Sequence, residues 1–270
     1  MKRLFGFPIL SLLFGLMWAG NGEAHHVGDH AVVLHTNTQW DDCAIVLDPS
    51  LTLNEWKTFS RDLASIIYFK PTTGAKPLGK GRFDVGLEQA TTAPLKDYNG
   101  SWNNTFSHPS ADHWLTGDNH RLSIPVITGR YGVTEKLDMG LLFTDNWNTN
   151  YGWVGFDVKY VFHQDRSRGL YYAARWSTVV LTGVQDMDYY QGATDLLISR
   201  DVGRFTPYAG VTGTYSVAKE ETDKVDLIQQ RSTATEGILG TQFHWRHLSM
   251  SAEVDFARIN MYTLKIGVAI

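Results

Sequence analysis

The sequence has only one cysteine, Cys43, so no disulfide can form within the chain. Beyond Ala24 it has no uninterrupted apolar run long enough to span a bilayer as a helix, which excludes a helical membrane protein. Its formal net charge is −4, so it lacks the basic excess of a nucleic-acid-binding protein. Aromatic residues and glycine, by contrast, are plentiful, with 9 Trp, 12 Tyr, 13 Phe and 25 Gly.

The N-terminal segment Met1–Ala24 has the pattern of a secretory signal peptide. Two basic residues precede the apolar segment Leu4–Ala19, and small residues occupy the −3 and −1 positions at Gly22 and Ala24. We predict that the mature chain begins at His25, with an N-terminal membrane anchor as the alternative. Export without a helical anchor leaves the periplasm, the medium or the outer membrane.

Apolar and polar residues alternate with a period of two along most of the chain. In one run Val154, Phe156 and Val158 share a face, while Asp157 and Lys159 lie on the other. This pattern is typical of β-strands that have one apolar and one polar face. The candidate strands are Arg82–Thr92, Arg121–Arg130, Lys136–Asn146, Gly152–His163, Leu170–Thr182, Gly192–Arg200, Phe205–Ser216, Thr233–Trp245, Leu248–Ala257 and Asn260–Ile270.

Short and long connections alternate between these strands. Outer-membrane barrels have short periplasmic turns and longer external loops, so this alternation predicts the orientation. We therefore predict an all-β fold, a transmembrane antiparallel up-and-down β-barrel of about 10–12 strands in the bacterial outer membrane. A secreted, soluble β-sandwich is the alternative fold. The short connections are Tyr131–Glu135, Gln164–Gly169, Asp201–Arg204 and Arg246–His247, and the others are Ala93–His120, Asp145–Tyr151, Gly183–Gln191 and Ala218–Ser232.

A short amphipathic helix precedes the barrel. Apolar residues from Leu53 to Ile67 follow helical spacing, and Thr52 with Glu55 resembles a capping box. The sequence leaves open whether this helix crosses the periplasmic mouth, plugs the lumen, or gives way near Ala64 to a strand ending at Pro71. The predicted organisation is a signal peptide over residues 1–24, an irregular periplasmic leader over 25–52, and the helix and barrel over 53–270.

The segment Phe69–Gly79, with the sequence FKPTTGAKPLG, is followed by Phe83–Glu88 and later by Thr206–Val211. Together these segments resemble a family of uncharacterised bacterial outer-membrane β-barrel proteins. The resemblance covers Leu53–Ile270 and implies a short N-terminal helix leading into a barrel. It implies no activity, so no residue takes a catalytic or binding role from it.

With the apolar face of each strand turned to lipid, the other face lines the lumen. On the strand Arg121–Arg130 the apolar set Leu122, Ile124 and Val126 is assigned to lipid, which turns Arg121 inward. Such residues form either a salt-bridged interior that rigidifies the wall or a narrow path that favours cations. Barrels of this size fall between filled and open ones, so we predict a small or plugged lumen. The lumen candidates are Asp84, Glu88, Arg121, Asp138, Asp157, Lys159, Arg175, Glu236, His244, Glu253, Asp255 and Lys265.

Two groups of residues raise the question of catalysis or metal binding. His244 with Ser249 or Ser251 and Glu253 or Asp255 supplies the residue types of a Ser–His–acid hydrolase, but near the periplasmic rim and without a nucleophile-elbow motif. Histidines in the leader and in the long loop match no strong metal motif. We predict no enzymatic activity, no metal and no cofactor. These histidine-rich groups are His25, His26, Asp29, His30 and His35, and His108, Asp112, His113, Asp118 and His120.

The sequence therefore predicts an outer-membrane barrel that serves as a narrow passive pore for small solutes. The alternative is a non-conducting structural or surface-interaction barrel. Outer-membrane lipid is the predicted partner, with small solutes as the second and nucleic acid excluded. The identity of the solute and the oligomeric state are not determined by the sequence.

Overall fold

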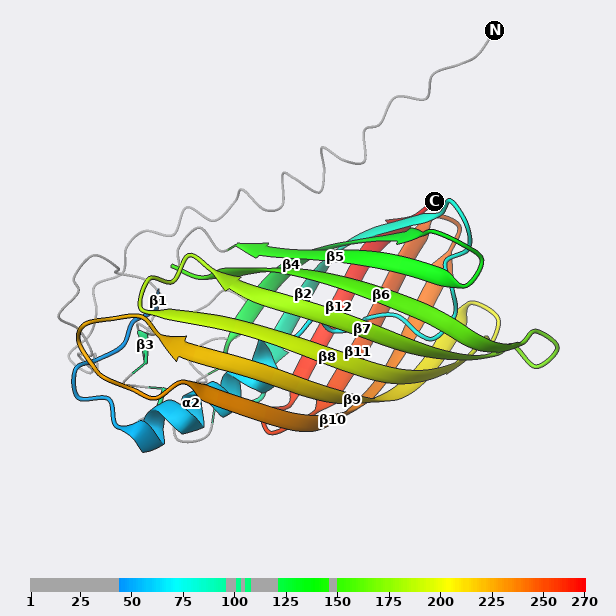
Figure 1. Ribbon diagram of the computed structural model, residues 1–270. Coiled ribbons are helices and arrows are strands. Elements are labelled where there is room, and N and C mark those ends of the chain that lie inside the picture. Colours follow the sequence, from blue (N-terminus) through cyan, green and yellow to red (C-terminus); the bar gives the residue numbers. More distant parts are fainter. Residues whose placement is uncertain (1–43, 96–100, 103–104, 108–120, 146–149) are drawn as a thin grey trace, which may run out of the picture.

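The computed structural model describes residues 44–95, 101–102, 105–107, 121–145 and 150–270. Ten of its strands close into one antiparallel barrel in which each strand pairs with the next along the chain and β12 pairs with β2 (Figure 1). The predicted signal peptide and residues 25–43 of the predicted leader lie outside the described residues. The barrel strands are β2 (Phe83–Thr92), β4 (Ser123–Gly132), β5 (Leu137–Asp145), β6 (Gly152–Asp165), β7 (Leu170–Thr182), β8 (Met187–Arg200), β9 (Phe205–Glu220), β10 (Gln230–Trp245), β11 (Leu248–Phe256) and β12 (Met261–Ala269).

The predicted barrel is confirmed, and each of the ten candidate strands corresponds to one strand of the wall. The largest differences lie in β8 and β9, which are longer than predicted. Strand β8 begins at Met187 and β9 continues to Glu220, because Met187 pairs with Glu220 across the two strands. The backbone pairing of β8 with β9 therefore extends beyond the residues in which apolar and polar side chains clearly alternate.

The two ends of the barrel differ. The short-turn end carries the connections 133–136, 166–169, 201–204 and 246–247, together with the C-terminal Ile270. The opposite end, the long-loop end, carries the described connections 183–186, 221–229 and 257–260. In Figure 1 the short-turn end lies at the right and the long-loop end at the left.

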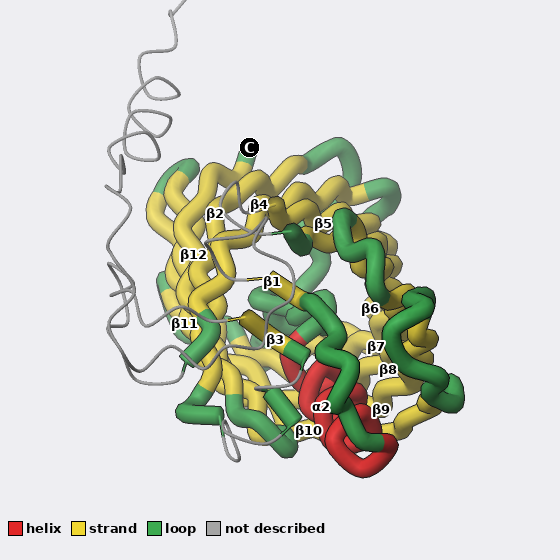
Figure 2. Tube along the Cα trace, turned by 90° about the vertical axis from the view of Figure 1, so that its left-hand side faces the viewer, coloured by secondary structure: helices red, strands yellow, loops and turns green. Residues whose placement is uncertain are grey.

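The N-terminal part of the described chain covers the long-loop end. Helix α2 (Leu53–Ile66) begins with the predicted capping box, in which Thr52 and Glu55 bond to each other's backbone. Ahead of it, β1 (Ala44–Ile45) pairs with β3 (Phe106–Ser107), and both lie across the ring of strands with α2 (Figure 2). We call residues 44–66 the cap. Among the described helices, none combines the length and apolarity needed to cross a membrane.

The position of the cap bears on two predictions. The short turns are predicted to face the periplasm, and residues 25–52 are predicted to form a periplasmic leader. Residues 44–52 belong to the cap and lie at the end opposite the short turns. If the short turns face the periplasm, residues 44–52 lie at the external end of the barrel and are not a periplasmic leader. The two predictions therefore cannot both hold for these residues.

After α2 the chain turns into the barrel and runs through its interior to the short-turn end (Figure 1). We call residues 67–80 the lumen segment. The chain reaches the rim at Gly79 and Gly81, whose φ values of +93° and +76° favour glycine, and then enters β2. A strand ending at Pro71, one of the options left open by the sequence, is wrong. The helix lies at the long-loop end, and the non-helical residues that follow it fill the lumen.

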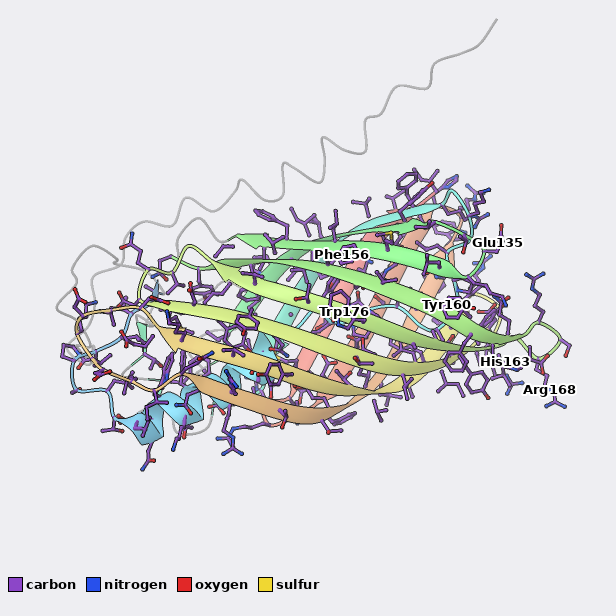
Figure 3. All side chains as sticks on the ribbon, viewed as in Figure 1. Glu135, Phe156, Tyr160, His163, Arg168 and Trp176 are labelled. Atoms are coloured by element: carbon purple, nitrogen blue, oxygen red, sulfur yellow. The ribbon has the colours of Figure 1, made fainter. Side chains whose placement is uncertain are left out.

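The wall is apolar outside and polar inside. On the outer face Leu264 is 65% exposed and Tyr160 and Trp176 are each 50% exposed, and the last two project from the wall in Figure 3. On the inner face Asp138, Asp157 and Lys159 are fully buried. Soluble proteins have the opposite arrangement, with a polar surface and an apolar interior. The two faces of the wall arise from the predicted alternation of apolar and polar residues.

One strand departs from the predicted assignment. On β4 and just before it, Leu122, Ile124 and Val126 are buried inside the barrel, whereas Ile127 is 43% exposed. Arg121 thus lies on the opposite side of the chain from these residues, and its assignment to the lumen is wrong. The reason is that α2 and the residues after it supply apolar partners inside the barrel, so this part of the lumen is not polar.

Candidate functional site

The filled lumen is the candidate site. Of the twelve predicted lumen residues, ten are buried on the inner face of the wall, and His244 is half-buried on the same face of β10. Charges of both signs are thus removed from water, and such charges require partners. The ten are Asp84, Glu88, Asp138, Asp157, Lys159, Arg175, Glu236, Glu253, Asp255 and Lys265.

The largest charged network joins four strands, β4, β6, β7 and β8, and the lumen segment. The Nε atom of Arg175 lies 2.5 Å from Asp157 Oδ2, and its Nη1 atom lies 2.5 Å from Asp195 Oδ2. Asp157 also receives two hydrogen bonds from Arg130, at 2.7 and 3.2 Å. All four side chains are at least 94% buried, so every charge here depends on its partners.

The lumen segment completes this network from inside. Arg175 Nη2 donates to the carbonyl oxygen of Phe69 at 2.7 Å, with the guanidinium 4.7 Å from the centre of the Phe69 ring. The hydroxyl of Tyr68 donates to Asp195 Oδ1 at 2.5 Å and lies 3.1 Å from Thr212 Oγ1. The network thus holds the wall together and fixes the lumen segment to it.

A second charged cluster lies on β2 and β12. Lys265 Nζ is 2.6 Å from Asp84 Oδ1 and 3.8 Å from Glu88 Oε1. Glu88 Oε1 also accepts hydrogen bonds from the hydroxyls of Thr72, at 2.7 Å, and Thr128, at 2.8 Å. Thr72 therefore links the lumen segment to this part of the wall.

Thr72 has a conformation that β-branched residues rarely adopt. Its φ is +45°, in the left-handed region. Three contacts hold it there: its N–H donates to Glu253 at 2.9 Å, its hydroxyl donates to Glu88, and its carbonyl accepts from Ser251 at 2.9 Å. Such strain persists where the surroundings over-determine it, and here Thr72 is held by β2 and β11, the two strands on either side of β12.

The lower part of the lumen segment is bound by polar groups of the wall. Lys159 Nζ donates to the carbonyl oxygens of Gly74, at 3.1 Å, and Lys76, at 2.8 Å, and pairs with Asp138 at 3.1 Å. The N–H of Gly74 donates to Gln242 at 3.0 Å, and that of Leu78 donates to Asp138 at 3.2 Å. Gly74 is required here, since an added Cβ would lie 2.8 Å from the Cβ of Ser199.

The cap is fixed to the long loops. Asp62 of α2 accepts a hydrogen bond from the indole N–H of Trp102, at 2.8 Å, and pairs with Arg258. The N–H of Leu47 donates to Asp186 at 3.0 Å, and the indole of Trp56 donates to the carbonyl of Ile228 at 3.2 Å. Because these partners come from separate loops, the cap closes the long-loop end around its circumference.

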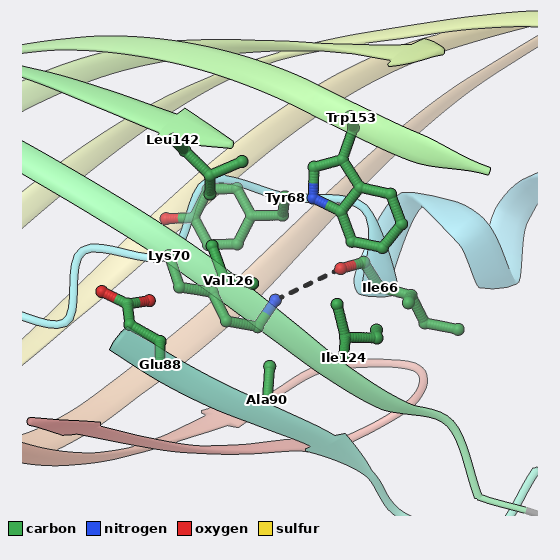
Figure 4. Close-up of a pocket in the computed structure, with 9 residues that line it drawn as sticks. All are labelled: Ile66, Tyr68, Lys70, Glu88, Ala90, Ile124, Val126, Leu142 and Trp153. Atoms are coloured by element: carbon green, nitrogen blue, oxygen red, sulfur yellow. Dashed lines mark hydrogen bonds between the residues drawn. The ribbon is translucent and has the colours of Figure 1, made fainter. Parts of the chain in front are cut away.

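A small cavity lies beside the lumen segment, inside the barrel. A cavity of about 10 Å³ lies between Lys70 and the wall (Figure 4). Lys70 Nζ donates to the carbonyl of Ile66 at 3.5 Å and lies 5.1 Å from the centre of the Tyr68 ring. A cavity of this volume holds about one water molecule. It is therefore not a passage for solutes.

The hydrolase residues are not assembled for catalysis. His244 and Ser249 are cross-strand partners, but no hydrogen bond joins His244 to Ser249 or Ser251 among the described residues. Ser251 donates to Thr72, and Glu253 accepts from Thr72 and from Tyr208 at 2.7 Å. These groups are occupied in holding the lumen segment.

The sequence also contains two histidine-rich groups that are candidates for metal binding. The two histidine-rich groups, within residues 25–35 and 108–120, lie outside the described residues, as does Cys43. Within the described ranges, no three His, Cys, Asp or Glu side chains are close enough together to hold a metal ion.

Three charged residues inside the barrel were not predicted from the sequence: Arg130, Asp195 and Lys70. The inward position of Arg130 follows from the alternation observed on β4, in which the next residue, the aromatic Tyr131, faces outward. Asp195 stands in an otherwise apolar run with Leu196 and Leu197, where alternation is hidden. Lys70 lies in a segment with no periodicity, so no sequence pattern places it inside.

No protein-family model matches the chain, and no curated protein sequence matches it. Solved structures of similar fold include an outer-membrane channel from Pseudomonas putida F1, with 11% identity over 75% of this chain and 100% of that chain and a TM-score of 0.43. Others are OprG of Pseudomonas aeruginosa (14% identity, 72% and 99% covered, TM-score 0.32) and the attachment invasion locus protein Ail of Yersinia pestis (10%, 71% and 99%, 0.33). At these values the similarities carry no argument about family or function.

Proposed function

We propose that this protein is an outer-membrane barrel closed by its own N-terminal residues, and that it does not conduct in the conformation described. The observation that carries the proposal is the path of the lumen segment. It bonds to side chains of eight of the ten barrel strands between Tyr68 and Leu78. The cap closes the long-loop end, so both the entrance and the interior are filled. This proposal assigns the protein no catalytic activity.

A lipid environment is supported by the outer face of the wall. Exposed apolar residues such as Leu141, Val211 and Leu264, which are 54–65% exposed, continue around the barrel. Aromatic pairs stand near the short-turn end, including Phe83 with Tyr131 at 4.6 Å between ring centres. An apolar band bordered by aromatic residues is the outer surface of a membrane-spanning barrel, whereas in water it would be an aggregation surface. Outer-membrane lipid is therefore the proposed partner of the wall.

Substitution of Leu264 by arginine tests this proposal. In the middle of β12 and facing lipid, the arginine should lower the free energy of unfolding by about 2–4 kcal/mol. Urea unfolding of the protein folded into lipid vesicles measures the loss. The matched control is Ile228→Arg, because Ile228 is 70% exposed in the loop between β9 and β10 and should change stability by less than about 0.5 kcal/mol. Equal, small effects at both positions would show that Leu264 faces water.

A narrow passive pore for small solutes is the second candidate function. The charged wall favours it, since an uncharged wall would suffice for a permanently filled barrel. Among the described strands, eight acidic and four basic side chains are buried in the wall. If the lumen segment left, the formal charge of the wall would favour cations.

Conductance in planar bilayers separates the two candidates. Under our proposal the full chain inserts without discrete openings, whereas a variant lacking residues 44–78 gives cation-selective steps. Heat-modifiable migration on a gel serves as the control for folding of both proteins. Regular openings of the intact, folded chain would refute a closed resting state and favour the pore, and that result does not depend on whether the deletion variant folds.

A further inference from the structure

A cleft of about 280 Å³ opens at the short-turn end, between the lumen segment and the rim of the wall. Its floor is formed by residues 76–79, and its sides by Arg82, Glu135 and the hairpin of β6 and β7. Its volume is close to the lower limit of small-ligand sites.

The charges around the cleft are mainly positive. The four short turns and residues 79–82 together contain seven Lys or Arg residues and two acidic ones. Figure 3 shows Arg168 at the tip of the β6–β7 hairpin and Glu135 at a neighbouring turn. Described long-loop connections 183–186, 221–229 and 257–260 instead carry four acidic and two basic residues. A cleft within a positive rim attracts anions.

Some charges that line the cleft are already paired, and others are not. Lys76 is committed to Asp201, at 2.6 Å, and Tyr171 donates to the same carboxylate at 3.3 Å. Arg166 makes only a long contact, 3.4 Å, to Gln164, and Arg82 forms no ion pair with any described residue. Two guanidinium groups are therefore available to a ligand in the same cleft.

The amide of Gln164 adds a donor. Its Nε2 atom is buried and has no hydrogen-bond partner among the described residues, while its Oε1 atom accepts from Arg166. An unpaired buried donor is costly, and a ligand oxygen would satisfy it. Gly79 has a φ of +93°, which favours glycine, and an added Cβ would make only ordinary contacts, 3.8 Å from Glu135 Oε2 and 3.9 Å from Arg82 Cδ.

We propose that this cleft binds a phosphate-type oxyanion between Arg82 and Arg166, from either a free anion or a phospholipid headgroup. Guanidinium groups match phosphate in geometry and form charge-assisted hydrogen bonds to it. Two unpaired guanidinium groups facing one carboxylate favour a ligand that carries more than one negative charge. Both guanidinium groups lie outside the lumen segment, but residues 76–79 of that segment form the floor of the cleft, so the site rests on the closed conformation proposed above.

Isothermal titration calorimetry of the full chain with inorganic phosphate, in zwitterionic detergent, tests the proposal. Arg82→Gln and Arg166→Gln should each weaken binding by about tenfold or more. Arg168→Gln is the matched control, because Arg168 lies on the same turn, carries the same charge and does not line the cleft. It should weaken binding by less than about twofold, since it contributes only at longer range.

A second arm in lipid nanodiscs distinguishes the source of the anion. If the ligand is a free anion, phosphate binds as tightly in phosphatidylglycerol nanodiscs as in phosphatidylcholine nanodiscs. If it is a lipid headgroup, phosphatidylglycerol prevents phosphate binding. Absence of phosphate binding in detergent, or equal weakening by Arg168→Gln and the two cleft variants, would overturn the proposal. Urea unfolding of each variant identifies any loss that is due to misfolding, and the two cleft variants give independent readings.

Discussion

Replacing Arg175 by methionine should lower the free energy of unfolding by about 3–5 kcal/mol. The substitution keeps the apolar volume of the side chain but removes the partner of two buried carboxylates, Asp157 and Asp195. It also leaves the carbonyl of Phe69 without its donor. Urea unfolding of the protein in lipid vesicles, followed by tryptophan fluorescence, measures the loss.

Arg168→Met is the control for the removal of an arginine. Arg168 is exposed, with its ion-pair distance to Asp165 at 3.7 Å, so its loss should cost less than about 0.5 kcal/mol. Adding Asp195→Asn to Arg175→Met should restore part of the stability, because Asp157 keeps Arg130 and Asp195 is no longer charged. Similar losses for the two single arginine variants would contradict the inference that the lumen network stabilises the barrel.

The strands of the wall could be predicted from the sequence because the alternation that identifies each strand involves residues close together in the chain. On β6, Val154 and Asp157 show their faces within a few residues, and pairing with the next strand follows from the order of the chain. The predicted orientation of β4 is wrong because apolar residues can face either lipid or an apolar plug. Leu122, Ile124 and Val126 face the cap, and alternation alone does not distinguish the two environments.

The path of the lumen segment could not be predicted in this way. Thr72 bonds to Glu253, 181 residues later in the chain, and Phe69 bonds to Arg175, 106 residues later. The segment makes no continuous backbone ladder, so it needs no periodic pattern. Its contacts instead use single backbone groups and wall side chains, which become neighbours only when the barrel closes.

The lumen contains two separate apolar clusters, and this separation limits how the plug can move. The upper cluster joins the cap to Phe69 and the upper wall, including Trp56, Phe59 and Trp102. The lower cluster surrounds Ala75 with Val161, Ala173, Leu197, Tyr208 and Ile238. Along the lumen segment, Phe69 and Thr72, which precede Ala75, bond to the charged networks of Arg175 and Lys265 respectively. The cap can therefore loosen while the lower half of the lumen segment stays in place.

Replacing Trp56 by alanine should show this independence. Trp56 is fully buried, stacks on Phe59 with ring centres 6.2 Å apart, and donates to Ile228. Truncating a buried tryptophan costs about 3–5 kcal/mol, which corresponds to about a hundredfold or greater loss of hydrogen-exchange protection in α2. The amides of Gly74 and Leu78, bonded to the lower wall, should keep most of their protection.

Two further variants separate the causes of that loss. Trp56→Phe keeps an aromatic ring but removes the indole N–H, so it should cost only about 0.5–1.5 kcal/mol beyond the change in packing. Lys57→Ala, at the exposed neighbouring position, should leave the exchange rates in α2 within about twofold. If Trp56→Ala lowered protection equally in α2 and at Gly74 and Leu78, the cap and the lumen segment would open as one unit. The barrel would then have a single plug that leaves or stays as a whole, and the charged networks would not separate its two halves.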